Sequence, residues 1–233
     1  VESVRMRPLG RNLAANGEKQ FYENGILFAD PTFLSVFTFP LVKGDPAKAL
    51  SNPDSLVITE TAARKYFGAD DPMGRTLRLF DALDFKVTGI ARDVPRNSHL
   101  QFALLGNFDV VMKRLGQRGG WWNNNFYTYV RLAPKTNPAR LAAPVYNYLK
   151  KIWPQTTTFI NLQPLLDIRL RSNYAIDIGG ASQAKAQYVR IFAAVAFLVL
   201  LIACINFMNL ATARSGLRSR EVGVRKVVGA GRT

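Results

Sequence analysis

The sequence is poor in the side chains on which most enzyme sites and small disulfide-linked folds depend. Its 233 residues include one cysteine, Cys204, and one histidine, His99. A single cysteine excludes an intrachain disulfide. No group of Cys, His and carboxylate residues has the spacing of a metal site. We therefore expect a domain stabilised by its hydrophobic core alone, with no catalytic residue, bound cofactor or metal ion.

Acidic residues are scarce as well. The chain carries 16 Asp and Glu against 31 Lys and Arg, a formal net charge of +15 at pH 7. Such a basic chain suits an acidic ligand, a surface of anionic lipid headgroups or a nucleic acid. The acidic pairs Asp70/Asp71 and Asp81/Asp84 lie in predicted turns, where carboxylates are usually solvated, so they do not point to a paired-carboxylate enzyme.

A phosphate-binding loop is also missing. The pattern Gly-x-x-x-x-Gly-Lys-Ser/Thr does not occur, and the glycine-rich stretches 68–74 and 223–231 lack its Gly-Lys-Ser/Thr end. That end is needed because the lysine reaches the phosphates and the hydroxyl binds Mg²⁺. We expect no ATP to be bound by this chain.

What the sequence does contain is one long apolar segment, residues 191–213, with 23 uncharged residues between Arg190 and Arg214. As a helix it would measure about 35 Å, enough to cross a hydrocarbon core of about 30 Å. The alternative is a buried core helix of a soluble protein, but such helices seldom stay uncharged over this length. The segment predicts a transmembrane helix.

The flanking charges predict its orientation. Six basic residues and one acid follow Ala213, whereas the 20 residues before Ile191 hold three basic residues and one acid. The positive-inside rule places the C-terminus in the cytoplasm and residues 1–190 outside it. Nucleic acid is then not expected as a partner, because the basic tail is short and adjoins the bilayer. No apolar leader precedes residues 1–190, so we expect an N-terminally incomplete domain.

Residues 1–181 predict an α+β extracytoplasmic domain, a mixed sheet with packed helices. Residues 55–59 are rich in β-branched residues, Thr59 can cap a helix over 60–67, and Gly68 can end it. Asn16-Gly17 is a hairpin signal. The other predicted strands are 4–8, 25–29, 76–80, 84–94, 126–132 and 157–164, with a strand and then a helix over 100–115 and further helices over 32–37 and 139–153.

Residues 182–214 predict a single helix that enters and spans the membrane, because no proline or glycine separates Ser182 from the apolar segment. Tyr188 suits an interfacial anchor. Asn206 and Asn209 share one side near the cytoplasmic end. Either they hydrogen-bond another transmembrane helix or they lie among the headgroups, and the sequence leaves both open.

Residues 206–214 and 218–230 closely resemble the signature of FtsX-like, MacB-type ABC transporter permeases. Residues 55–77 are similar to the periplasmic core domain of the same family. The resemblance implies that residues 191–213 are the helix after the periplasmic domain, and that 215–233 begin the permease domain with a short cytoplasmic amphipathic helix that contacts an ABC ATPase.

We expect Gly216 to break the membrane helix, Ser219 to cap the coupling helix over 220–228, and Gly229 to end it. A basic segment lying on anionic lipid is the alternative, and it is compatible with coupling. The residues expected to contact the ATPase are Arg218, Arg220, Glu221, Val224, Arg225, Lys226 and Val228.

The function that this resemblance implies is transmission of ATP-driven motion from a cytoplasmic ATPase to the periplasmic domain, to export or extract a peptide, lipoprotein or toxin. The ATPase is expected on a separate chain, and the permease as a dimer or pseudo-dimer. The alternative is a sensor or receptor with a signalling transmembrane helix. A sensor would continue that helix into a linker domain, whereas a break is expected at Gly216.

Overall fold

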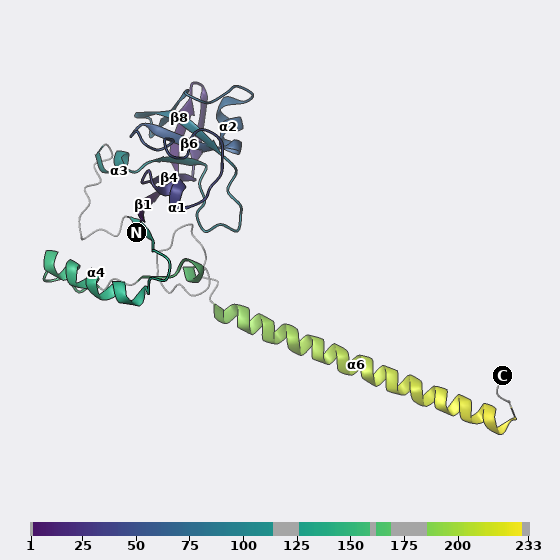
Figure 1. Ribbon diagram of the computed structural model, residues 1–233. Helices are drawn as coiled ribbons and strands as arrows, with labels where there is room; N and C mark the ends of the chain where they lie inside the picture. Colours follow the sequence, from purple (N-terminus) through teal and green to yellow (C-terminus); the bar gives the residue numbers. More distant parts are fainter. Residues whose placement is uncertain (1, 114–125, 159–161, 169–185, 230–233) are drawn as a thin grey trace. The chain divides into compact units, whose positions relative to one another are not determined.

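The computed structural model describes residues 2–113, 126–158, 162–168 and 186–229 (Figure 1). The chain forms two compact units, residues 1–163 with 174–181, and residues 164–173 with 182–233. The first unit contains a ten-stranded sheet. The second contains a long helix, α6.

The described elements are ten strands, five α-helices and one 3-10 turn. The strands are β1 (Glu2–Leu9), β2 (Asn12–Asn16), β3 (Lys19–Glu23), β4 (Ile26–Ala29), β5 (Leu41–Lys43), β6 (Ser55–Thr59), β7 (Thr76–Leu79), β8 (Leu83–Ala91), β9 (Leu104–Asn107) and β10 (Tyr127–Arg131). The helices are α1 (Phe33–Val36), α2 (Glu60–Phe67), α3 (Asp109–Lys113), α4 (Ala139–Ile152), the 3-10 turn η1 (Leu165–Asp167) and α6 (Ala186–Val227).

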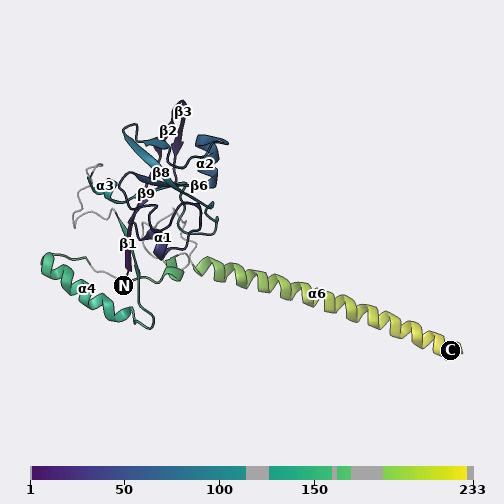
Figure 2. The ribbon, with the colours of Figure 1, turned by 45° about the horizontal axis from the view of Figure 1, so that its top comes forward.

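The sheet is mixed, as the sequence predicted. Its strand order is β10-β1-β4-β9-β6-β8-β7-β2-β3, and β5 pairs with β8 outside this path. The pairs β4–β9 and β6–β8 are parallel, and the other pairs are antiparallel. The β2–β3 hairpin forms one end of the sheet (Figure 2).

The sheet separates two hydrophobic cores, one on each face. In β6, Leu56 and Ile58 belong to the core that α2 covers, while Val57 belongs to the core that contains Phe33 of α1. Alternate residues of a strand point to opposite faces, so an uninterrupted apolar run suits a strand covered on both sides. This explains why all five residues of β6 are buried.

The helix after β6 begins and ends where its sequence signals predict. The side-chain oxygen of Thr59 accepts a hydrogen bond from the Ala62 amide at 3.3 Å, and Gly68 follows Phe67 with a φ of 69°. Ala62, Tyr66 and Phe67 are buried against the sheet. The predicted strand, cap, helix and glycine are confirmed.

Most of the other predicted elements are present, with a few differences. The hairpins β2–β3 and β7–β8, and α4 with Pro144 inside it, are confirmed. The strands β2, β3 and β5 were not predicted, although the turn between β2 and β3 was. Of the strand predicted over 157–164, residues 159–161 lie outside the described residues, and the others are not in a strand.

Helix α6 corrects a prediction about the C-terminal segment. It runs for 42 residues without interruption, so Gly216 does not break it and Ser219 does not cap a separate helix. One glycine in a helix costs about 1 kcal/mol, which neighbours such as Ala213, Arg214 and Arg218 readily offset. The helix ends at Val227, shortly before Gly229, whose φ of 86° suits an end there. Residues 169–185, which include Ser182, lie outside the described residues.

Candidate functional site

The predicted coupling residues up to Lys226 lie on the last three turns of α6 and are exposed. Val228, also exposed, directly follows the helix, and its amide donates to the Val224 carbonyl at 3.1 Å. At about 100° per residue, Val224 and Val228 fall on one side of the helix with position 217, whereas Lys226 falls on the opposite side. The carboxylate of Glu221 accepts a hydrogen bond from the Arg225 guanidinium at 2.7 Å, one helical turn away. This surface therefore combines apolar side chains with a charged pair and several cations.

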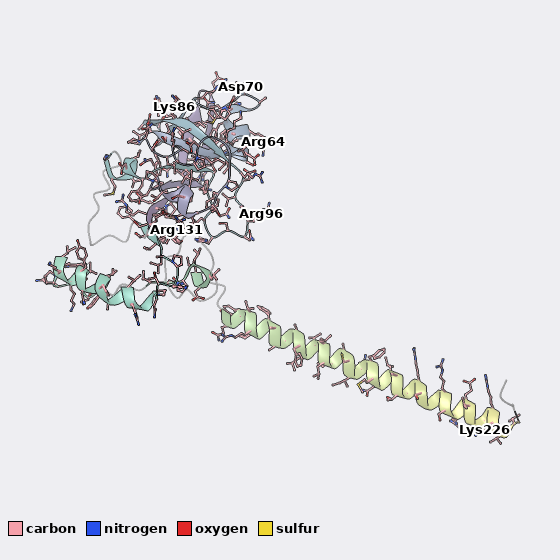
Figure 3. The ribbon with its side chains drawn as sticks, in the orientation of Figure 1. Arg64, Asp70, Lys86, Arg96, Arg131 and Lys226 are labelled. Carbon is pink, nitrogen blue, oxygen red and sulfur yellow. The ribbon has the colours of Figure 1, made fainter. Side chains whose placement is uncertain are left out.

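Figure 3 labels Lys226 near the end of this helix. In the part of the chain that the structure describes, Arg218, Arg220 and Lys226 have no carboxylate partner. The structure brings Val224, Val228 and the Glu221–Arg225 pair together on one stretch of helix. It keeps Arg218 and Arg220 beside them on the same turns.

Asn206 and Asn209 lie nearer the middle of α6, on the N-terminal side of the coupling residues, and are also exposed. Neither side-chain amide makes a hydrogen bond to another residue in the described ranges. Nearby, the Thr212 hydroxyl donates to the Met208 and Asn209 carbonyls at 2.8 and 2.9 Å, which satisfies that polar group within the helix. The amides of Asn206 and Asn209 are thus available to a second helix.

Within the described residues, α6 provides the one helix long and apolar enough to cross a membrane. The candidate segment is Gln187–Val227, with a mean hydropathy of 2.8 over its most apolar window, and none of that window is buried. A helix that is apolar all round and exposed all round is unsuited to water.

Three of the four acidic residues singled out in the sheet unit, Asp70, Asp71 and Asp84, form ion pairs. Asp71 accepts from Lys43 at 2.9 Å, and Asp84 accepts from Arg78 at 2.8 Å. The hydrogen bond from each cation is the main reason that the pKa of each of these carboxyls is lowered. A lowered pKa suits a permanent carboxylate and not a general acid, which needs a raised pKa.

The single histidine packs among aromatic rings. His99 Nε2 lies 3.1 Å from the Tyr129 hydroxyl, and the His99 ring is 6.5 Å from the Phe37 ring. No group of three or more His, Cys, Asp and Glu in the described ranges is placed to hold a metal ion. His99 thus contributes to packing between β10 and the segment after α1.

Sequence reasoning missed a polar cluster that joins the edge strand β3 to α2. The Glu23 carboxylate accepts from Lys65 Nζ at 2.7 Å and from the Tyr66 hydroxyl at 3.1 Å. Burial is the main cause that raises the pKa of Tyr66, and the charge of Glu23 adds to it. No local signal could have found this cluster, because 42 residues separate Glu23 from Lys65.

A mixed sheet covered on both faces, joined in one chain to a helix of membrane-spanning length, is the architecture of a membrane-anchored domain. The family described as the MacB-like periplasmic core domain matches residues 1–147. The match covers more than half of the chain, and the chain therefore belongs to this family of ABC transporter permeases. Permeases of this family are not themselves catalytic.

Solved structures agree with this assignment. A domain of a protein described as a permease from Porphyromonas gingivalis is 25% identical, with a TM-score of 0.58 over 71% of this chain and 80% of that one. The periplasmic region of MacB from Actinobacillus actinomycetemcomitans is 18% identical, with a TM-score of 0.50 over 65% and 67%.

The extracellular domain of the noncanonic ABC-type transporter YknZ from Gram-positive bacteria is 14% identical, with a TM-score of 0.52 over 70% of this chain and 82% of that one. At these identities the MacB and YknZ likenesses concern the fold. No curated protein sequence matches the chain.

Proposed function

We propose that this chain is the periplasmic domain and adjoining membrane helix of an ABC transporter permease, and that α6 carries ATP-driven motion from a separate cytoplasmic ATPase. Membership of the permease family supports the transporter, and the continuity of α6 supports its role in transmission. Its 42 residues correspond to about 63 Å, roughly twice the thickness of a hydrocarbon core. A helix that spans the bilayer with residues 191–213 therefore continues into the cytoplasm without a hinge.

The coupling surface is then the rigid end of the membrane helix. A push on Val224, Val228 or the Glu221–Arg225 pair moves the helix as a whole, because an uninterrupted helix is far stiffer than a flexible linker. ATP is hydrolysed by the partner, and the chain supplies apolar and charged contacts. The cargo is a peptide, lipoprotein or toxin.

Two further features support an assembly of permeases in the inner membrane with a cytoplasmic C-terminus. The charge difference across residues 191–213 favours that orientation. The exposed amides of Asn206 and Asn209 favour a second helix beside α6, as a permease dimer or pseudo-dimer provides.

A receptor is the alternative function, because α6 continues through Gly216 without a break. A signalling helix that continues beyond the membrane has the same appearance. Family membership favours the permease, since MacB-like periplasmic core domains belong to ABC transporter permeases.

The test is co-purification of the complete permease from membranes, followed by an ATPase assay of the eluate. We expect bound ATPase activity with the native chain and its loss when residues 220–228 are deleted. The double change Glu221→Ala and Arg225→Ala should weaken it, while Lys86→Ala on the sheet unit serves as the control. An intact, folded permease that never retains an ATPase would favour the receptor.

A further inference from the structure

Helix α4 is strongly amphipathic. At about 100° per residue, Leu141, Val145, Tyr148 and Ile152 fall within an arc of about 60° on one side. The other side carries the polar and basic residues Arg140, Asn147, Lys150 and Lys151. A helix with this division in water needs a partner for its apolar side.

The described residues leave most of that apolar side uncovered. Leu149, at the border of the arc, is buried with 4% of its surface exposed, whereas Val145, Tyr148 and Ile152 expose 39%, 64% and 43%. Within the part of the chain that is described, neither hydrophobic core of the sheet includes a residue of α4. Among the described residues, α4 therefore buries Leu149 at one edge of its apolar side and leaves the rest of that side exposed.

The charges around this face are all of one sign. Between Asp109 and Asp167 the sequence contains no acidic residue and eight Lys and Arg. Arg140, Lys150 and Lys151 form no ion pair with any described carboxylate, and Lys150 Nζ lies 5.5 Å from the Tyr146 ring centre. The apolar face thus has a basic border without internal compensation.

We infer that α4 lies on the surface of a bilayer containing anionic phospholipid, with Val145, Tyr148 and Ile152 inserted at the headgroup boundary. A basic border and an aromatic-containing apolar face are the features of interfacial helices. A second copy of this chain is a poor occupant, because it would bring two acid-free basic surfaces together.

The rest of the chain favours lipid over an acidic protein groove. Only 33 residues lie between Ile152 and Ala186, where α6 begins. Even fully extended, they reach about 110 Å. If α6 spans a membrane, α4 is tethered near that same surface, which raises its effective concentration there. The inference needs α6 in a membrane but does not need coupling to an ATPase.

The experiment uses the full chain with Cys204→Ser, reconstituted into vesicles of phosphatidylcholine alone or mixed in equal parts with phosphatidylglycerol. A spin label is placed at Tyr148→Cys, or at Asn147→Cys on the polar side as the matched control. Accessibility to oxygen and to a water-soluble nickel chelate is measured for both. We expect the label at 148 to gain oxygen contact and lose nickel contact in anionic vesicles, while the label at 147 stays accessible to nickel.

The charge contribution is tested by combining Arg140→Gln, Lys150→Gln and Lys151→Gln. Each removed charge should weaken binding of α4 to the anionic surface about fivefold, so the three together should weaken it about 100-fold. The label at 148 should then have the same oxygen and nickel accessibility in both vesicle types. The combination Lys19→Gln, Lys48→Gln and Lys86→Gln removes the same charge from the sheet unit and should preserve that difference.

Two results would overturn the inference. In one, the label at 148 remains accessible to nickel in both kinds of vesicle. In the other, it is shielded from oxygen and nickel alike in detergent as well as in vesicles, which means that protein covers this face. Neither result changes the expected co-purification with an ATPase, so the two proposals fail separately.

Discussion

Asp93 stabilises the N-terminus of α2 although it lies 32 positions after Thr61 in the sequence. Its carboxylate accepts hydrogen bonds from the Thr61 amide at 2.9 Å and the Thr61 hydroxyl at 2.7 Å, and Arg64 lies 3.6 Å away. Burial works to raise the pKa of Asp93, but the hydrogen bonds from Thr61 and the charge of Arg64 outweigh it, and the pKa is lowered. The carboxylate also faces the positive end of the helix.

The lowered pKa gives a prediction about pH. Because the folded pKa lies below the unfolded value of about 3.9, Asp93 stabilises the fold fully above that value, and the contribution is lost as the pH falls through the folded pKa. We expect Asp93→Asn to lower the free energy of unfolding at pH 7 by about 1 kcal/mol and to flatten its decline below about pH 4.

To test the role of Asp93, the full chain is unfolded with urea in detergent at neutral and at acid pH. Near-ultraviolet circular dichroism monitors the unfolding. Asp81→Asn, in the turn between β7 and β8, is the matched control and should leave the acid decline as in the native chain. An unchanged pH dependence in Asp93→Asn would refute the role given to this carboxylate.

Gly106 in β9 is required for packing against Phe28. A Cβ at this position would lie 2.5 Å from Phe28 Cε1 and 2.8 Å from Cδ1. The Phe28 ring is fully buried, 5.8 Å from the Phe85 ring, and has little room to move. We expect Gly106→Ala to reduce the stability of the sheet unit by about 2 kcal/mol.

Thermal unfolding followed by circular dichroism tests this expectation. Gly10→Ala is the control, because a Cβ there meets no atom within 4 Å. Equal melting temperatures for the two variants would show that the core around Phe28 can adjust.

At the scale of elements, the central strands and α6 show how local sequence and surroundings combine. β4 is apolar at every position and β6 at its three central positions, and both strands lie inside the sheet with both faces covered. The hairpin β2–β3 is more polar and lies at the end of the sheet. The apolar runs thus agree with the positions of their strands, because a central strand has no solvent face.

The continuity of α6 gives a prediction about Gly216. In the full chain with Cys204→Ser, spin labels at Leu210→Cys and Lys226→Cys should lie about 24 Å apart along the helix axis, with a narrow distance distribution. Gly216→Ala should keep that distribution, because alanine favours the helix by about 1 kcal/mol over glycine.

Gly216→Pro should have the opposite effect on the distance distribution from Gly216→Ala. Proline removes a backbone hydrogen bond and clashes with the preceding turn, so the distribution should broaden and shift to shorter distances. A broad distribution already in the chain with Gly216 would contradict a continuous α6 and support the separate coupling helix expected from the sequence.

At the scale of the whole molecule, the charges predict a topology. In right-side-out membrane vesicles of the Cys204→Ser chain, a membrane-impermeant maleimide should label Ser51→Cys in the sheet unit. It should label Ser219→Cys only after the vesicles are permeabilised. Labelling of Ser219→Cys in sealed vesicles, with Ser51→Cys protected, would reverse the orientation proposed here.

Much of this architecture follows from short stretches of sequence. Periodicity and caps acting within a few residues predict β6, α2 and Gly68, the hairpin at Gly17, and the apolar part of α6. The same is true of the composition that points away from an enzyme, since one histidine and one cysteine are visible without a structure.

The partnerships between distant residues came from the tertiary structure. Thr61 meets Asp93, Glu23 meets Lys65, and β4 lies parallel to β9 because the folded sheet brings them together. No local sequence pattern predicts these long-range contacts, because the free energy that selects them comes from burying both hydrophobic cores at once. The passage of α6 through Gly216 has a related cause, since the stability of the whole helix outweighs the preference of one residue.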